Sequence, residues 1–127
     1  FRSDLEAFAF RLGELRNTAP GLTTTALLSG AKINGVADVE WLSETGEPLQ
    51  TGQWEEPDRR RLCMLLAGGT ESGGRLAMMI NGAAEGVSFC LPLRDEFEWR
   101  LILPCQGDQP GIRWDVAGRT VAIAIER

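Results

Sequence analysis

The sequence predicts a mainly β fold, an antiparallel β-sandwich preceded by one amphipathic α-helix. The leading segment repeats apolar residues with a helical period, and the later segments are short, apolar or alternating. Glycine, proline and polar residues separate these later segments, with no helical pattern between them. Parallel neighbours would need such helical crossovers, so we expect antiparallel strands stacked in two layers.

The composition is that of one folded domain. The chain has 127 residues, of which 43% are hydrophobic and 24% charged, and a chain of this length can bury one sizeable core. Thirteen basic and eighteen acidic residues give a net charge of −5, which disfavours nucleic acid and anionic membrane as partners. No apolar run approaches the roughly 20 residues that a membrane-spanning helix needs.

The segment 1–17 is typical of an amphipathic helix. Its apolar residues are spaced by four, three, four and three, which places them on one face: Phe1, Leu5, Phe8, Leu12 and Leu15. Ser3 and Glu6 match a capping box, which predicts a start near Asp4. Pro20 predicts an end near residue 17 or 18. No second helix follows, so this face packs against the outside of the sandwich or belongs with a domain that is missing here.

The strands are predicted from apolar runs and from alternation. The expected strands are residues 39–42, 62–67, 76–81, 87–91, 98–103 and 120–125. The second and third of these are continuously apolar, as in strands that are buried on both faces. In the fifth, we expect Trp99, Leu101 and Leu103 on one face of the sheet.

The residues between the strands are expected to form turns and loops. Gly46 should supply the backbone conformation that the turn at 43–48 requires. The other irregular segments are 29–35, 51–60, 68–74 and 107–118, the last with room for a short strand at 112–115. Residues 23–28 are a strand or an extended linker.

The three cysteines indicate a reduced, cytoplasmic protein. They are odd in number and form no CxxC pair, and Cys63 and Cys90 lie inside apolar runs, where a thiol behaves as a small buried hydrophobe. The chain has no histidine, and zinc normally takes four ligands. We therefore expect no metal site and no cofactor.

The charged residues offer limited chemistry. Without histidine the chain cannot build a Ser-His-Asp or Cys-His arrangement. A glycosidase needs only two carboxylates about 5 to 10 Å apart, and Asp95, Glu96 and Glu98 are available, although a solvated loop is the other explanation for them. We assign no catalytic residue.

The basic cluster 59–61 also has an ordinary explanation. Three acidic residues precede it, Glu55, Glu56 and Asp58, so we expect a mutually screened surface stretch. A phosphate or nucleic-acid site is the alternative for this cluster.

The four tryptophans suggest a second kind of site. An indole can stack on the C–H face of a sugar ring, and Trp54 and Trp114 lie in polar, irregular stretches where they could be exposed. The alternative is that both are packing residues. Trp41 and Trp99 lie in strand patterns, and we expect them in the core.

The order of the segments is itself informative. The opening DLEAFAFRLGELRNTAPGL is followed by DVEWLSETGEPLQTGQW, RRRLCMLLAG, MMINGAAEGVSFCLP, WRLILPCQG and AGRTVAIAIER. In this order the chain resembles the C-terminal region of bacterial glycogen debranching enzymes of the isoamylase-like, α-amylase type. The second segment is similar to that family's D-V-x-W-L-x-x-D-G-x-x-M-x-x-x-x-W, with Thr45 in place of aspartate and Leu49 in place of methionine.

The resemblance implies a division of the chain. Residues 1–22 would be the last helix of a missing catalytic barrel, which would pack on the apolar helix face Phe1, Leu5, Phe8, Leu12 and Leu15, and residues 23–127 would be the C-terminal sandwich. The family's catalytic carboxylates lie at the ends of barrel strands. The resemblance therefore implies a structural, inactive fragment of an enzyme that hydrolyses α-1,6 branch linkages of glycogen or limit dextrin.

Two other hypotheses come from the residues themselves. The chain could be a free-standing module that binds α-glucan through Trp54 or Trp114. Its exposed helix face could also make the chain dimerise.

Overall fold

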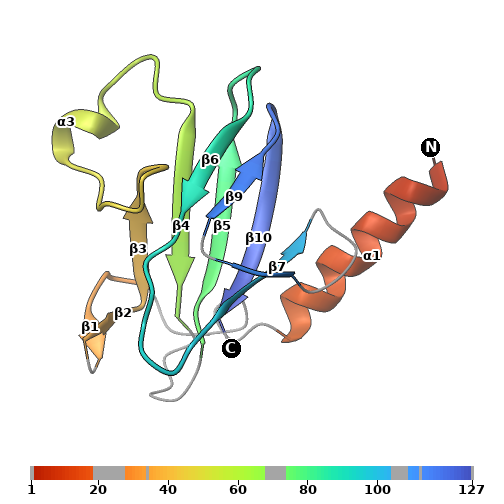
Figure 1. The fold of residues 1–127 in the computed structure, drawn as a ribbon, viewed down its shortest axis with the longest axis horizontal. Helices are drawn as coiled ribbons and strands as arrows, with labels where there is room; N and C mark the ends of the chain where they lie inside the picture. The colour runs from red at the N-terminus through yellow and green to blue at the C-terminus, as the bar shows by residue number, and fades with distance from the viewer. Residues whose placement is uncertain are drawn as a thin grey trace.

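The computed structural model gives the arrangement of most of the chain (Figure 1). The residues that it describes are 2–18, 28–33, 35–67, 74–103, 109–111 and 113–126. They form antiparallel sheets with one long N-terminal helix, so the predicted fold class is confirmed.

The elements follow one another in this order. The helices are α1 (Arg2–Thr18) and the short α3 (Thr51–Trp54). The strands are β1 (Lys32–Ile33), β2 (Val36–Ala37), β3 (Val39–Leu42), β4 (Arg61–Leu66), β5 (Leu76–Asn81), β6 (Val87–Cys90), β7 (Trp99–Leu103), β8 (Gln109–Pro110), β9 (Arg113–Val116) and β10 (Thr120–Glu126).

The main layer is a six-stranded sheet in the order β3-β4-β5-β10-β7-β8. The second layer is the antiparallel pair β6-β9, which crosses one face of the main sheet (Figure 1). The main core lies between the two layers, and it contains Leu42, Cys63, Leu65, Ala77, Met79, Phe89, Leu91, Trp99, Leu101, Trp114, Val116, Ala122 and Ala124. We call the face of the main sheet that lines this core the inner face, and the opposite face the outer face.

The residues of β10 show that both faces of the main sheet are apolar. Ala122 and Ala124 belong to the core between the layers, whereas Ile123 belongs to a second cluster on the outer face. Small side chains on the inner face of β10 leave room for the large aromatic residues of the opposing layer, Phe89 and Trp114.

Strand β7 departs from the expected alternation. Trp99 and Leu101 lie in the main core, but Leu103 lies in the outer cluster, so the expectation that all three share a face is wrong. The register shifts between Ile123 and Ala124 of β10, which pair with Leu103 and Leu101. An extra residue on one strand of a pair turns the side chains that follow to the opposite face.

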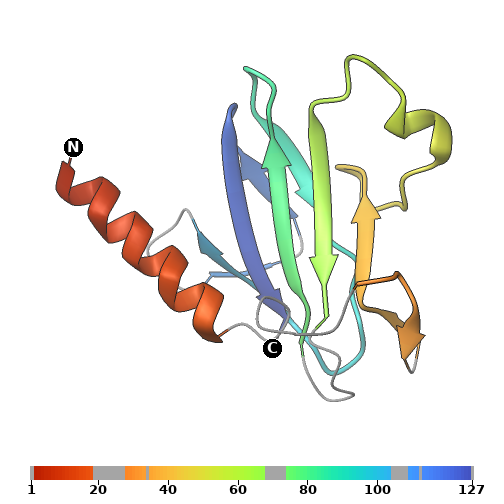
Figure 2. The same cartoon turned by 180° about the vertical axis from the view of Figure 1, so that it is seen from behind.

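Helix α1 meets the outer face near one end of the helix. Leu15 is buried there in a cluster with Leu66, Leu76, Leu103 and Ile123, while the N-terminal half extends away from the sheet (Figure 2). Packing against the outside of the sandwich is therefore confirmed for this end of the helix. The helix ends at residue 18 as predicted, and it begins two residues before the predicted start.

Three short elements were not predicted, or were placed differently. The expected loop at 29–35 contributes β1 to a small β1-β2 hairpin, in which Gly35 has a φ of +81°. The irregular segment at 51–60 contains α3, and the short strand expected at 112–115 is β9. Most of the segment 23–28, most of the hairpin connection at 68–74 and residues 104–108 lie outside the described residues.

Candidate functional site

The turn between β3 and α3 is held by backbone hydrogen bonds. The amide of Ser43 donates to the carbonyl of Glu47, and the amide of Gly46 donates to the carbonyl of Ser43. Gly46 has a φ of +87°, and a Cβ there would lie 2.8 Å from the carbonyl oxygen of Cys90. Glycine is thus required both by conformation and by space, as predicted for this turn.

The turn brings two tryptophans together on the outer face. The Trp41 and Trp54 rings have centroids 5.5 Å apart and planes at 77°, an edge-to-face arrangement. Their exposed fractions are 37% and 49%. The expectation that Trp41 lies in the core is wrong, because β3 is an edge strand and Trp41 pairs with Met64, whose side chain lies on the outer face.

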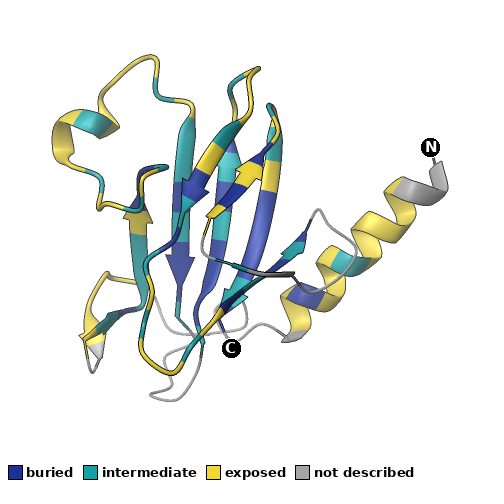
Figure 3. Ribbon diagram, viewed as in Figure 1, coloured by how far each residue is buried: buried dark blue, intermediate teal, exposed yellow. Residues whose placement is uncertain are grey.

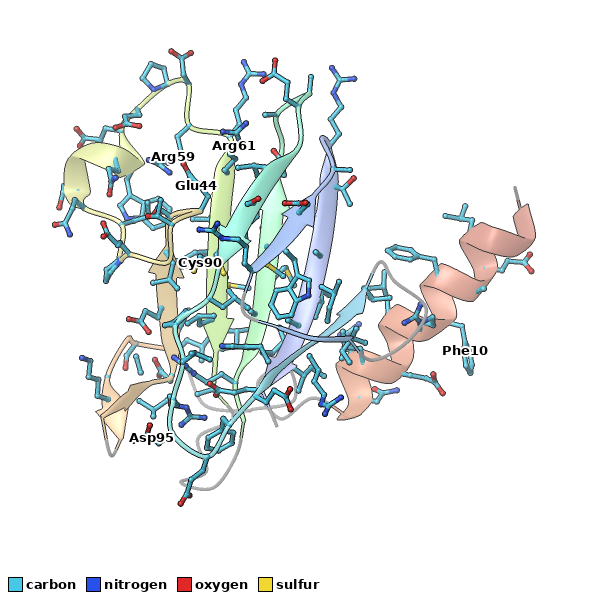
Figure 4. The ribbon with its side chains drawn as sticks, viewed as in Figure 1. Phe10, Glu44, Arg59, Arg61, Cys90 and Asp95 are labelled. Carbon is cyan, nitrogen blue, oxygen red and sulfur yellow. The ribbon has the colours of Figure 1, made fainter. Side chains whose placement is uncertain are left out.

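Beside this aromatic pair, the chain forms a charged hollow of about 310 Å³. It is lined by Glu44, Glu56, Asp58, Arg59, Arg60, Arg61, Ala83 and Glu85. A guanidinium nitrogen of Arg59 lies 3.6 Å from a carboxylate oxygen of Glu44, and another lies 3.5 Å from Glu56. Of the predicted pairings within this stretch, the structure shows that of Arg59 with Glu56. Glu44, Arg59 and Arg61 gather beside α3 and the start of β4 (Figure 4).

A second hollow of about 280 Å³ adjoins the first. It shares Glu56, Arg59, Arg60 and Arg61 with the charged hollow, and it adds Trp54, Leu62 and Ile80. Two polar atoms in this region, Oε2 of Glu44 and Nε of Arg61, are buried without a hydrogen-bond partner in the described structure. Both atoms are closed to solvent, and Oε2 of Glu44 is the oxygen that lies 3.6 Å from the Arg59 guanidinium.

Trp114 does not lie at this surface. Only 9% of it is exposed, and it belongs to the core between the layers, so the expectation that it could be exposed is wrong. Strand β9 pairs with β6, which turns Trp114 toward the main sheet together with its cross-strand partner Phe89. Trp99 is fully buried, as predicted.

The acidic residues after Pro92 lie on a turn. Asp95, Glu96 and Glu98 are all exposed, and a carboxylate oxygen of Glu98 lies 3.2 Å from the guanidinium of Arg100 (Figure 4). This exposure matches the solvated-loop explanation. Within the described residues, no group of three or more Cys, Asp or Glu side chains is arranged to hold a metal ion.

A buried ionic cluster was missed by the sequence reasoning. The carboxylate of Glu126, 2% exposed, accepts hydrogen bonds from Nε and Nη2 of Arg75 at 3.0 and 2.9 Å, and from Nε of Arg94 at 3.0 Å. The guanidinium of Arg75 also lies 5.5 Å from the ring centroid of Trp99. The two-residue repeat of β10 could have revealed this cluster. Ala122 and Ala124 face the core between the layers, and Glu126 is the next residue with the same spacing.

The electrostatics of this cluster favour the ionised carboxylate. Burial alone raises the pKa of Glu126, but hydrogen bonds from Arg75 and Arg94 outweigh it and hold the pKa below its ordinary value. Arg75 and Glu126 are buried, Arg94 is partly buried, and a carboxylate oxygen of Glu40 lies 4.0 Å from Arg75. Figure 3 shows that the buried residues are concentrated on the strands. We therefore interpret this cluster as a structural clamp that joins β10 to the start of β5 and to the loop after β6.

Cys63 is a structural thiol. It is fully buried on the inner face of β4, and burial raises its pKa to about 12, from 9.0, despite the nearby charge of Arg75. We expect alkylation by iodoacetamide at pH 8 to modify Cys63 only after unfolding, measured by mass spectrometry of peptides from native and denatured samples. The denatured sample is the control, and rapid modification of Cys63 in the folded chain would contradict this prediction.

The residues that form the sandwich match a known protein family. A model of the glycogen debranching enzyme C-terminal domain family matches residues 33–123. The chain belongs to this family. The match runs from the end of β1 into β10, so the debranching enzyme C-terminal domain includes both layers of the sandwich and the Trp41–Trp54 pair. The resemblance drawn from the motifs is confirmed.

Individual relatives agree with the family. The chain is 28% identical over 125 residues to a protein named glycogen debranching enzyme from Pectobacterium atrosepticum, covering 97% of this chain. Proteins of the same name from Pectobacterium carotovorum subsp. carotovorum and Yersinia enterocolitica are 28% and 26% identical, each covering 98% of the chain. The chain spans only 17% of the length of each relative. The matched segment includes most of α1, which the family model does not reach.

None of the helices formed by the described residues combines the length and the apolar character that a bilayer crossing requires.

Proposed function

We propose that this chain is the non-catalytic C-terminal sandwich of a cytoplasmic debranching enzyme, whose preceding part hydrolyses α-1,6 branch linkages of glycogen or limit dextrin. One observation carries the proposal: the chain matches the C-terminal domain family and spans only 17% of relatives named glycogen debranching enzyme. The catalytic carboxylates would then belong to the remaining part. The free thiols of Cys63 and Cys90 are compatible with a reducing compartment.

The division within the chain is part of this proposal. Residues 1–22 would belong structurally to the preceding catalytic part, and residues 23–127 would form the sandwich. A free-standing glucan-binding module is not favoured as an alternative, because the match is to a domain of larger enzymes.

The surface that would receive the preceding part lies beside α1. The helix and the outer face of the sheet diverge and leave an apolar groove of about 470 Å³, lined by Phe8, Leu12, Met78, Leu103, Arg119, Thr120, Val121 and Ile123. Leu5, Phe8, Leu12 and Val121 are all exposed in the isolated chain. Exposed apolar surface of this kind marks a protein interface.

The set of helix residues that we expect to contact the preceding part therefore has to be revised. Leu15 is already buried against Leu66, Leu76, Leu103 and Ile123 of the sandwich, so it is not available to the preceding part. Phe1 lies outside the described residues. We propose that the preceding part packs on Leu5, Phe8 and Leu12, and into the groove behind them.

The test compares this chain with the product of the complete gene. We expect the complete protein to release linear maltooligosaccharides from glycogen limit dextrin, and the 127-residue chain to release none. Turnover by the chain alone would overturn its non-catalytic role. A complete protein without activity on α-1,6 linkages would overturn the assignment to a debranching enzyme.

The docking surface makes a separate prediction. In the complete protein, we expect Phe8→Asp to weaken the contact by about 2 kcal/mol or more, because it removes a large apolar side chain and buries a charge. The result should be a lower midpoint of thermal inactivation and faster proteolysis near α1. Phe10→Asp is the matched control, because Phe10 lies on the opposite side of the helix and points away from the sheet (Figure 4). Equal effects of the two variants would contradict the proposed surface.

A further inference from the structure

We infer that Trp41 and Trp54, together with the two hollows beside them, form a surface site for an α-glucan chain. We call this region the Trp41–Trp54 site. The choice of ligand class rests on the proposed function, whereas the site itself rests on the geometry described here.

The aromatic pair provides an open apolar corner. Both indoles remain more than one-third exposed although each contacts the other, and their planes are close to perpendicular. An edge-to-face pair leaves ring surface uncovered, and the C–H face of a pyranose suits such a surface. The short helix α3 holds Trp54 in place, since Gln53 of this helix accepts hydrogen bonds from the amide of Gln50 and from Nε of Arg59.

Hydrogen-bonding groups surround the corner. The hollow next to Trp54 is lined by Glu56 and by the three arginines 59–61, with Leu62 and Ile80 as its apolar floor. Guanidinium groups donate to hydroxyl oxygens and carboxylates accept from hydroxyl groups, so neighbouring hydroxyls of one sugar can be bound by both.

The charge of the hollow favours a neutral ligand. Its lining contains four carboxylates, on Glu44, Glu56, Asp58 and Glu85, and three guanidiniums, on Arg59, Arg60 and Arg61. A nucleic acid or another polyanion would meet more negative than positive side chains in this region. A glucan carries no charge and presents alternating apolar faces and hydroxyl edges, which match this mixture.

The hollow next to Trp54 shares no lining residue with the groove beside α1. Strand β3 is the edge of the six-stranded sheet, whereas α1 packs over Leu103 and Ile123 of β7 and β10. Figures 1 and 2 show α3 and α1 on opposite sides of the domain. A domain attached through α1 would present the Trp41–Trp54 site to solvent, where it could hold one glucan chain while the preceding part acts on a branch.

The experiment is native affinity electrophoresis of the 127-residue chain in gels with and without glycogen. We expect glycogen to retard the wild-type chain, and Trp54→Ala to weaken the apparent affinity about tenfold or more, since one stacking surface is lost. Trp41→Ala and Glu56→Gln should weaken it less. Phe10→Ala is the matched control, because it removes another exposed aromatic ring, 69% exposed, on the far helix.

The variants also distinguish loss of glycogen binding from loss of folded structure. A thermal unfolding scan of every variant separates lost binding from lost structure, and Trp54→Phe should keep part of the retardation if the ring itself binds. The inference is overturned if glycogen does not retard the wild-type chain, or if Trp54→Ala is retarded equally. In either case the complete protein could still cleave a short branched oligosaccharide, so the proposed function would stand. If the complete protein is inactive on α-1,6 linkages but the 127-residue chain binds glycogen, the proposed function is overturned and the inference about the Trp41–Trp54 site stands.

Discussion

Glu126→Gln is expected to lower the free energy of unfolding by about 3 kcal/mol. The carboxylate of Glu126 is the buried partner of Arg75 and Arg94, and an amide would remove the nearest countercharge of both guanidiniums, with Glu40 still 4.0 Å from Arg75. Removing one member of a buried ion pair typically costs 3–5 kcal/mol, and the glutamine should fall at the lower end because it still accepts a hydrogen bond. Urea titration followed by tryptophan fluorescence measures the change.

The control and the pH dependence sharpen this prediction. Glu98→Gln removes the same charge from an exposed pair with Arg100, and should change stability by less than about 0.5 kcal/mol. The folded-state pKa of Glu126 lies below its ordinary value of 4.5. Its contribution is therefore fully present above about pH 4.5 and is lost as the pH falls through the folded-state pKa. A difference between wild type and Glu126→Gln that grows at acid pH would contradict this account.

Phe89→Ala is expected to lower the free energy of unfolding by about 3–5 kcal/mol. Phe89 is fully buried on β6 at the centre of the core, and its removal leaves a cavity between the two layers in addition to the lost transfer free energy. The midpoint of urea unfolding measures this loss, if the slope of the transition is unchanged.

The same substitution at an exposed position provides the comparison. Phe10→Ala should change stability by no more than about 0.5 kcal/mol, because the Phe10 ring is mostly in water before and after folding. A loss below about 1 kcal/mol for Phe89→Ala would mean that the second layer does not pack on the main sheet as described.

The fold could be predicted largely from the sequence, because strand formation depends on local pattern. The strand predicted at 39–42 is β3 with the same bounds, and the strand predicted at 76–81 is β5. The bulge in β7 could not be predicted, because it depends on how two distant strands pair. Leu101 and Leu103 are two residues apart, a spacing that places side chains on one face of a regular strand. The register shift nevertheless places Leu103 on the other face.

The candidate site could be predicted less well, since exposure depends on which layer covers which face. Trp41 has a strand pattern, but it lies on an edge strand, on the face away from β6-β9. Trp114 lies in a polar stretch, yet pairing of β9 with β6 directs it into the core. Alternation shows which residues share a face of a strand, but it does not show which face the second layer covers. The contact between Trp41 and Trp54 likewise follows from the turn at Gly46, not from either residue alone.

The central position of β10 has a consequence for synthesis on the ribosome. This strand lies between β5 and β7, although it follows both in the sequence. Until the segment Thr120–Glu126 has left the ribosomal exit tunnel, the β3-β4-β5 and β7-β8 parts of the sheet have no strand to join them, and the backbone N–H and C=O groups along the facing edges of β5 and β7 stay unpaired. The nascent domain is therefore most vulnerable to aggregation and to chaperone capture immediately before its last strand emerges.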